Sequence, residues 1–146
     1  MNKLNRKLEY SLIALKHMSL KTPGELTTAK EVSDFYQSPF DATAKVMQVM
    51  AGHGLLRSEQ GATGGYQITR DLSKVNLQEL IEVIQGPTKI AKCLQHSRDK
   101  NASEDMDQAP CDIQKSCNII SPVVNLNNKL NEFYKSVTIR DLLARN

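Results

Sequence analysis

A chain of 146 residues, 40% of them hydrophobic, is long enough for one compact domain with a modest core. It lacks the run of about twenty apolar residues that a membrane-spanning helix needs. Its basic N-terminus has no apolar signal-peptide core, so we expect a cytoplasmic protein. Residues 1–76 carry the whole net charge of +3, with ten Lys/Arg against seven Asp/Glu, while residues 77–146 hold nine of each. This weak excess is in the direction that nucleic-acid binding requires.

The first third of the chain predicts three helices. Residues 1–20 carry a leucine stripe at helical spacing and predict a long first helix. Thr28 to Tyr36 predicts a second helix, which either Thr27 or Thr28 would cap. A tight turn follows. Ser38 is then expected as the N-cap of the third helix, with Pro39 at its first position and Asp41 as a capping-box acid.

The third helix, residues 39–51, has two unlike faces, and Gly52 and Gly54 end it. The face expected to point inward is apolar apart from one threonine and consists of Phe40, Thr43, Val46, Met47 and Met50. The opposite face is small or polar and consists of Asp41, Ala42, Ala44, Lys45 and Gln48. Side chains of that size and polarity fit a DNA groove.

Two short strands follow, residues 55–59 and 66–69, joined by a glycine-rich turn. A helix-turn-helix followed by such a hairpin is typical of a winged helix. Its second helix would enter the DNA major groove, and its wing would lie along the backbone. The alternative is a plain helical hairpin followed by a β-ribbon, with no ligand.

The second half of the chain predicts two further helices and a short final helix. Asn76 should cap a helix over residues 77–85, with Glu79 completing a capping box. A helix over residues 121–137 should begin with Ser121 as its N-cap. Its apolar residues recur at helical spacing and fit either a dimer seam or a helix that only fills the core; they are Val123, Leu126, Leu130, Phe133 and Val137. We favour the seam, because helix-turn-helix proteins usually read paired half-sites as dimers. Thr138 and Asp141 start the final helix.

Between these helices lies a segment that contains every cysteine, Cys93, Cys111 and Cys117. Residues 98–112 of it are rich in acids and amides and predict a long, solvated loop. Three cysteines in a cytosolic chain are poor material for structural disulfides. Soft thiolates suit iron–sulfur clusters or zinc instead.

The run GLLRSEQGATGGY, residues 54–66, resembles the wing of the Rrf-type winged helix-turn-helix transcription regulators. IscR-like and NsrR-like proteins belong to this bacterial family. The likeness extends from Leu4–Tyr10 to Thr138–Leu143. It implies a mainly α fold with a small β-hairpin wing and a long dimerisation helix, not an enzyme. It divides the chain into a DNA-binding region (1–87), a cysteine loop (88–120) and dimerisation and C-terminal helices (121–146), within one compact unit.

The resemblance also implies a double-stranded DNA operator, a homodimer and a set of DNA contacts. The residues at the matching positions are Lys3, Thr28, Ser38, Asp41, Ala42, Ala44, Lys45, Gln48, Arg57, Gln60, Gly64, Gly65 and Tyr66. Two of them depart from the IscR-like pattern. IscR-like proteins carry a glutamate at the position of Ala44 and an arginine at the position of Gln60. We therefore expect this protein to read a different operator.

Cluster-binding members of that family place three cysteines in the same loop, which implies a [4Fe-4S] or [2Fe-2S] cluster here. The first spacing is often five residues and is seventeen in this chain, so Cys93 is the least certain ligand. The histidine of IscR-like sites is replaced by Ile120. NsrR-like sites use an acid on the first helix of the other subunit, and Glu9 matches that position. His96 competes as a ligand, although an exposed loop histidine is the simpler interpretation.

The sequence therefore favours an iron–sulfur regulator, expected to be a repressor that responds to nitric oxide, redox state or iron–sulfur status. A cluster-free regulator is the alternative, switched by cysteine oxidation, because a flexible loop would let Cys111 approach Cys117. A thiol enzyme is disfavoured, since the chain has no C-x-x-C motif and no phosphate-binding loop.

Overall fold

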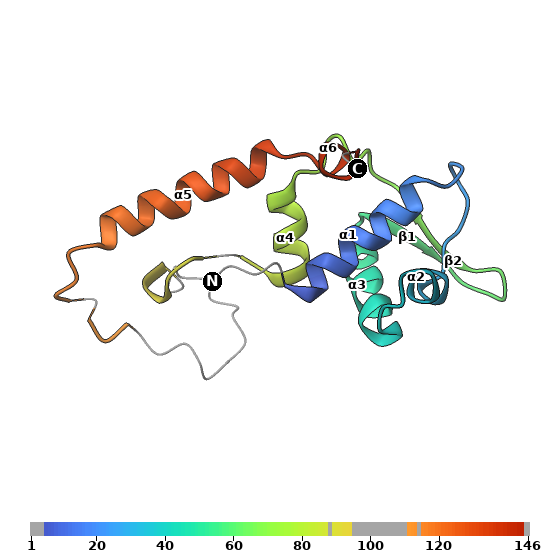
Figure 1. The fold of residues 1–146 in the computed structure, drawn as a ribbon, viewed down its shortest axis with the longest axis horizontal. Coiled ribbons are helices and arrows are strands. Elements are labelled where there is room, and N and C mark those ends of the chain that lie inside the picture. Colours follow the sequence, from blue (N-terminus) through green and yellow to red (C-terminus); the bar gives the residue numbers. More distant parts are fainter. Residues whose placement is uncertain (1–4, 88, 95–110, 114, 145–146) are drawn as a thin grey trace.

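The computed structural model describes residues 5–87, 89–94, 111–113 and 115–144. Its elements are α1 (Arg6–Ser19), α2 (Ala29–Tyr36), α3 (Phe40–Gly52), β1 (Leu56–Glu59), β2 (Gly65–Ile68), α4 (Leu77–Gln85), the short 3-10 helix η1 (Lys92–Leu94), α5 (Ile120–Ser136) and α6 (Ile139–Ala144). The predicted mainly helical fold with one small hairpin is confirmed (Figure 1). Within the described ranges, no helix combines the length and the apolar character that crossing a membrane requires.

The core lies where α1, α3 and α4 pack against one another. Its fully buried side chains come from helices and connecting segments alike and include Leu8, Leu15, Met47, Met50, Leu55, Val75 and Leu80. Ile139 of α6 is also completely buried among them, so the end of the chain completes a core that the first half builds. Each such side chain contributes roughly 1.5–3 kcal/mol by leaving water.

Two of the predicted helix caps are confirmed, and Thr138 caps α6 in the same way. The Thr28 hydroxyl accepts the backbone N–H of Glu31 at 3.1 Å, and the Asn76 side chain accepts that of Glu79 at 2.9 Å. The Thr138 hydroxyl, just before α6, accepts the backbone N–H of Asp141 at 3.1 Å. These oxygens pair with N–H groups that helix geometry leaves without an intrahelical partner.

The predicted cap of α3 is wrong. Pro39, not Ser38, is the N-cap residue, and the Ser38 hydroxyl instead hydrogen bonds with the hydroxyl of Thr43 at 2.9 Å. The Ser38 N–H donates to the carbonyl of Ser33 at 3.0 Å and so helps to close the C-terminus of α2. That N–H is therefore already used, and the capping box expected with Asp41 does not form.

The second predicted capping box is half right. Asn76 caps α4, but the Glu79 carboxylate pairs with the guanidinium of Arg70 instead of returning to the N-cap. A charged guanidinium is a stronger donor than a backbone amide, which explains the preference. The pair fastens the segment that leaves β2 to the start of α4.

Helix α5 differs from the other helices because none of its residues is buried. It begins at Ile120 without a side-chain cap, so the predicted cap by Ser121 is wrong. In Figure 1 it reaches away from the winged-helix body, with α4 as its neighbour. Its C-terminal end returns to the body, where Leu77 N–H donates to the Val137 carbonyl at 2.8 Å and Ile139 N–H donates to the Val75 carbonyl at 2.9 Å.

Candidate functional site

Helix α3 presents a polar face to solvent. Asp41, Lys45 and Gln48 are exposed, as the helical spacing predicts. Ala42 and Ala44 are half-buried, and Ala44 packs against the core. The face therefore offers one cation, one carboxylate and one amide at its outermost positions, with small side chains between them.

The opposite face holds α3 rigidly. Thr43, Met47 and Met50 have no exposed surface, and Val46 is 2% exposed. Phe40 does not share this environment, because 52% of its surface is exposed, and its predicted inward position is wrong. It stands in the first turn of the helix, where fewer elements surround a side chain than around Met47.

The turn before α3 fixes the angle between the two helices of the motif. Gln37 adopts the left-handed conformation (φ 54°), which reverses the chain within a few residues. Residues other than glycine rarely adopt this conformation, so the closed α2 terminus and the Ser38–Thr43 hydrogen bond must hold it. No residue type signals this left-handed conformation, since neither glycine nor asparagine stands at position 37.

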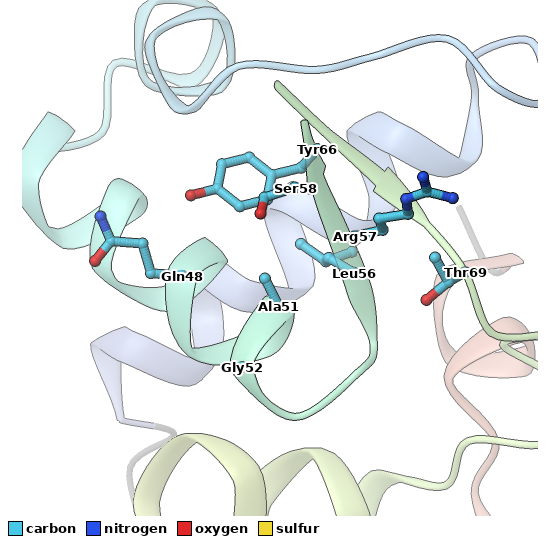
Figure 2. Close-up of a pocket in the computed structure, with 8 residues that line it drawn as sticks. All are labelled: Gln48, Ala51, Gly52, Leu56, Arg57, Ser58, Tyr66 and Thr69. Atoms are coloured by element: carbon cyan, nitrogen blue, oxygen red, sulfur yellow. The ribbon is translucent and has the colours of Figure 1, made fainter. Parts of the chain in front are cut away.

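A groove separates α3 from the wing. One part of it, about 480 Å³, is lined by Gln48, Ala51, Gly52, Leu56, Arg57, Ser58, Tyr66 and Thr69 (Figure 2). An adjoining part, about 540 Å³, runs toward the wing turn and the start of α2. Figure 2 shows the Tyr66 hydroxyl pointing toward α3, whereas the Arg57 guanidinium points away from it. Three polar side chains, those of Gln48, Ser58 and Tyr66, line both parts.

The wing is an antiparallel hairpin in which Ser58 pairs with Tyr66. A third segment joins it, because Thr27 and Tyr66 exchange backbone hydrogen bonds of 2.9 and 2.8 Å. Gly65 makes this possible, since a Cβ there would lie 2.9 Å from the Thr27 carbonyl oxygen. Thr27, which precedes the N-cap of α2, thus positions the wing beside the helix-turn-helix. This role of Thr27 is not predictable from the local sequence, in which Thr27 is only an alternative to Thr28 as a helix cap.

A charged cluster joins α1 to α2. The His17 ring bonds to the Glu31 carboxylate at 2.8 Å, and the Lys21 ammonium lies 2.6 Å from the same carboxylate. The His17 ring also packs on Phe35 and Tyr36, with centroids 5.3 and 5.7 Å away. Burial raises the pKa of Glu31, but the bonds from His17 and Lys21 outweigh it and hold that pKa below its ordinary value.

The remaining predicted DNA contacts fall into three groups. Lys3 lies outside the described residues. Thr28 is exposed, although its hydroxyl already caps α2, and Ser38 is half-buried. The wing positions are Arg57 and Gln60, which are exposed, and Gly64, Gly65 and Tyr66, which are half-buried. The structure thus brings four wing positions and Gln48 to one part of the groove, namely Gln60, Gly64, Gly65 and Tyr66. Arg57 lines the other part with its guanidinium directed away from α3, and Asp41 and Lys45 lie on the outer face of that helix.

The three cysteines are half-buried free thiols. Cys93 lies in η1, after α4, and Cys111 and Cys117 precede α5. In the part of the chain that the structure describes, no three His, Cys, Asp or Glu side chains gather as a metal site. The competing ligand His96 is outside the described residues. The donor set has the soft chemistry that iron–sulfur clusters take, although the described residues alone do not gather three such donors.

Glu9, the predicted fourth ligand, lies in the first turn of α1. Its carboxylate pairs with the Arg6 guanidinium at 2.8 Å, and 36% of its side chain is exposed. A pair this exposed contributes at most about 1 kcal/mol. Glu9 can therefore exchange Arg6 for another cation at little cost.

A helix-turn-helix with a rigid second helix, followed by a two-stranded wing, defines a winged-helix DNA-binding protein. The model of the Rrf2 family, described as iron-dependent transcriptional regulators, matches residues 4–145, so the chain belongs to this family. It is a DNA-binding transcription regulator and not an enzyme.

Relatives agree with this assignment. NsrR of Bacillus subtilis is 26% identical over 97% of this chain and 90% of its own length, and NsrR of Halalkalibacterium halodurans is 21% identical over 93% and 86%. Two solved structures share the fold. CymR, the global cysteine regulator of B. subtilis, has a TM-score of 0.68 at 19% identity, covering 99% of this chain and 98% of CymR. T. potens IscR has a TM-score of 0.65 at 18% identity, covering 98% and 87%.

Proposed function

We propose that this regulator acts in the cytoplasm as a homodimer, reads its operator with α3 and the wing, and senses its signal through a cysteine-held iron–sulfur cluster. We expect it to repress transcription in response to nitric oxide, redox state or iron–sulfur status. The observation that carries the DNA-reading part is the contrast between the two faces of α3. One face is buried completely at Met47 and Met50, while the other presents Lys45 and Gln48 to solvent.

Each exposed polar side chain of α3 can form a particular kind of hydrogen bond with a base edge. Lys45 donates to guanine O6 and N7, and the Gln48 amide forms a bidentate pair with adenine. The Asp41 carboxylate accepts from the cytosine amino group. The wing groups would then lie along the phosphates, where the glycines of its turn allow close approach.

The test of the reading role is Lys45→Ala, with Lys135→Ala on α5 as a matched control. Both lysines are exposed, so neither change should alter the fold. Lys45→Ala should weaken binding to the selected operator by roughly fivefold or more, while the control binds as wild type. A loss restricted to the operator identifies a base contact, and a uniform loss with a lower salt slope identifies a phosphate contact. If Lys45→Ala binds every duplex as wild type does, α3 is not the reader.

The dimer proposal rests on α5. Leu126 and Phe133 lie seven residues apart on one face and are 52% and 60% exposed. Large apolar side chains repeated along an exposed helix favour a protein partner. A second copy is the partner we propose, because helix-turn-helix proteins commonly read paired half-sites as symmetric dimers.

The cluster proposal rests on the chemistry of the donors. Cys93, Cys111 and Cys117 would supply three thiolates, and a carboxylate from Glu9 of the partner subunit would supply the fourth ligand. When bound, such a cluster supplies iron whose ligands respond to oxidants and small molecules. The cysteines of this chain would hold the cluster between the segment after α4, which carries Cys93, and the segment before α5, which carries Cys111 and Cys117. Each thiol is free and half-buried, which leaves it available for this role.

A second candidate is a regulator without a cluster, switched by thiol oxidation. It is favoured by the absence of any three-ligand group among the described residues. One of the structures with this fold is the oxidised form of Staphylococcus aureus CymR, with a TM-score of 0.66 and 16% identity. The two candidates differ in a simple observable, because only the first protein would show visible absorbance after purification without oxygen.

A further inference from the structure

Phe40 is more than half exposed, although it occupies the first turn of a helix whose other apolar residues are buried. Ala44 follows it by four residues and Gln48 by eight, so the three side chains form one ridge along α3. Gln48 lines the groove beside the wing. The ridge therefore runs from the exposed start of the helix to the groove that faces DNA in a winged helix.

The ridge begins with an aromatic ring and a methyl group and ends with an amide. In the major groove the apolar feature of a base pair is the C5-methyl group of thymine, and phenylalanine and alanine are side chains that contact it. The N-terminal residues of a recognition helix are those that reach base edges, and Phe40 is the first residue of α3. A hydrogen-bonding base edge would gain nothing from this ring.

We propose that Phe40, with Ala44 beside it, reads thymine methyl groups in the operator and is a specificity-determining residue of this regulator. The inference rests on the proposed DNA-reading role of α3. It extends that role to a particular base, thymine, and to its C5-methyl group. Lys45 and Gln48 offer only hydrogen bonds, whereas Phe40 selects for a methyl group. The operator half-site should then contain thymine beneath the start of the helix.

The experiment uses the full-length protein, with its operator first selected from a pool of random duplex DNA. Each thymine of that operator is replaced by deoxyuridine, which removes one methyl group and leaves every hydrogen-bonding group in place. Dissociation constants for wild type, Phe40→Ala and Phe35→Ala are measured with each duplex. Phe35 is the matched control because it is 70% exposed but belongs to α2.

Wild type should lose roughly fourfold in affinity at one or two uracil positions per half-site, as burial of one methyl group predicts. Phe35→Ala should keep this sensitivity, and Phe40→Ala should lose it while retaining residual binding to DNA. Residual binding and an unchanged circular dichroism spectrum show that the variant is folded. Phe40→Gln, which keeps a long side chain without the ring, should behave like Phe40→Ala.

Three outcomes overturn the proposal. One is wild type that selects an operator and is indifferent to every uracil, and another is Phe40→Ala that keeps the uracil sensitivity. The third is Phe40→Ala with wild-type affinity for the unmodified operator, which would mean that the ring contributes nothing to binding. Failure of wild type to select any DNA is a different result, since it overturns the DNA-reading role itself.

Discussion

The guanidinium of Arg140 donates to the carboxylate of Asp71 across 2.9 Å and so joins α6 to the turn that leaves the wing. Beside this pair, the Arg140 N–H donates to the Leu72 carbonyl at 3.1 Å. The backbone N–H and hydroxyl of Ser73 and the charge of Arg140 hold the pKa of Asp71 below its ordinary value. The start of α6, the start of α4 and the turn after β2 thus meet at one junction.

The first prediction concerns Ile139, which anchors this junction in the core with no exposed surface. Ile139→Ala should lower the free energy of unfolding by about 2–5 kcal/mol, because it removes buried methyl groups and leaves a cavity. Leu142→Ala on the same helix is the control, since Leu142 is 37% exposed and should cost much less. Urea denaturation measures both. Equal effects would mean that α6 is not docked through Ile139.

The second prediction concerns pH. Because the folded pKa of Glu31 is lowered, its carboxylate stabilises the fold above the pKa of the unfolded chain, and this stabilisation is lost as pH falls through the folded pKa. Glu31→Gln should therefore be less stable than wild type at neutral pH, by at most about 1 kcal/mol because 39% of the side chain is exposed. The difference should vanish in acid. If Glu31→Gln is still less stable than wild type by the same amount in acid, the difference comes from packing and not from the charge of Glu31.

The third prediction concerns assembly. Phe133→Asp places a charge on the apolar face of α5 and should convert the dimer to monomers, because burying that charge costs more than the seam can offset. Asn128→Asp is the control, since it adds the same charge at an exposed polar position. Analytical ultracentrifugation at micromolar concentration distinguishes the two variants. Wild-type protein that sediments as a monomer would remove α5 from the dimer role.

Much of the fold is readable from local sequence signals. The caps at Thr28 and Asn76 and the glycine-rich wing turn each depend on residues close in the chain, so the pattern predicts them. Ser38 does not cap α3 because its hydroxyl bonds with the Thr43 hydroxyl and not with a backbone N–H of the first turn. Phe40 has the spacing of a core residue, but spacing does not reveal which elements cover the first turn of a helix.

The candidate site was less predictable because its parts come from distant segments. The Thr27–Tyr66 bridge and the Arg140–Asp71 pair join residues far apart in sequence, and no periodicity signals either. The cysteines can be recognised as candidate ligands from their residue type alone. Their joint geometry depends on a loop and, in our proposal, on a second chain.

The donor set can be dissected with single variants. Cys111→Ala or Cys117→Ala should abolish the cluster, since each removes a thiolate that binds iron strongly. Glu9→Ala should be milder, giving a cluster that is lost faster. Arg6→Ala is its control, because it removes the other half of the same exposed pair and leaves the carboxylate in place. A full cluster in Cys93→Ala would leave a two-thiolate site with oxygen or nitrogen ligands.

The most direct test of the account measures operator affinity before and after reconstitution with iron and sulfide under nitrogen, with the visible spectrum recorded on the same sample. We predict that wild-type protein becomes coloured, that its dissociation constant for the operator changes by at least roughly fivefold, and that Cys117→Ala shows neither effect. A colourless protein that binds zinc or no metal, with operator affinity controlled only by thiol oxidation, would contradict the cluster proposal and support the thiol switch.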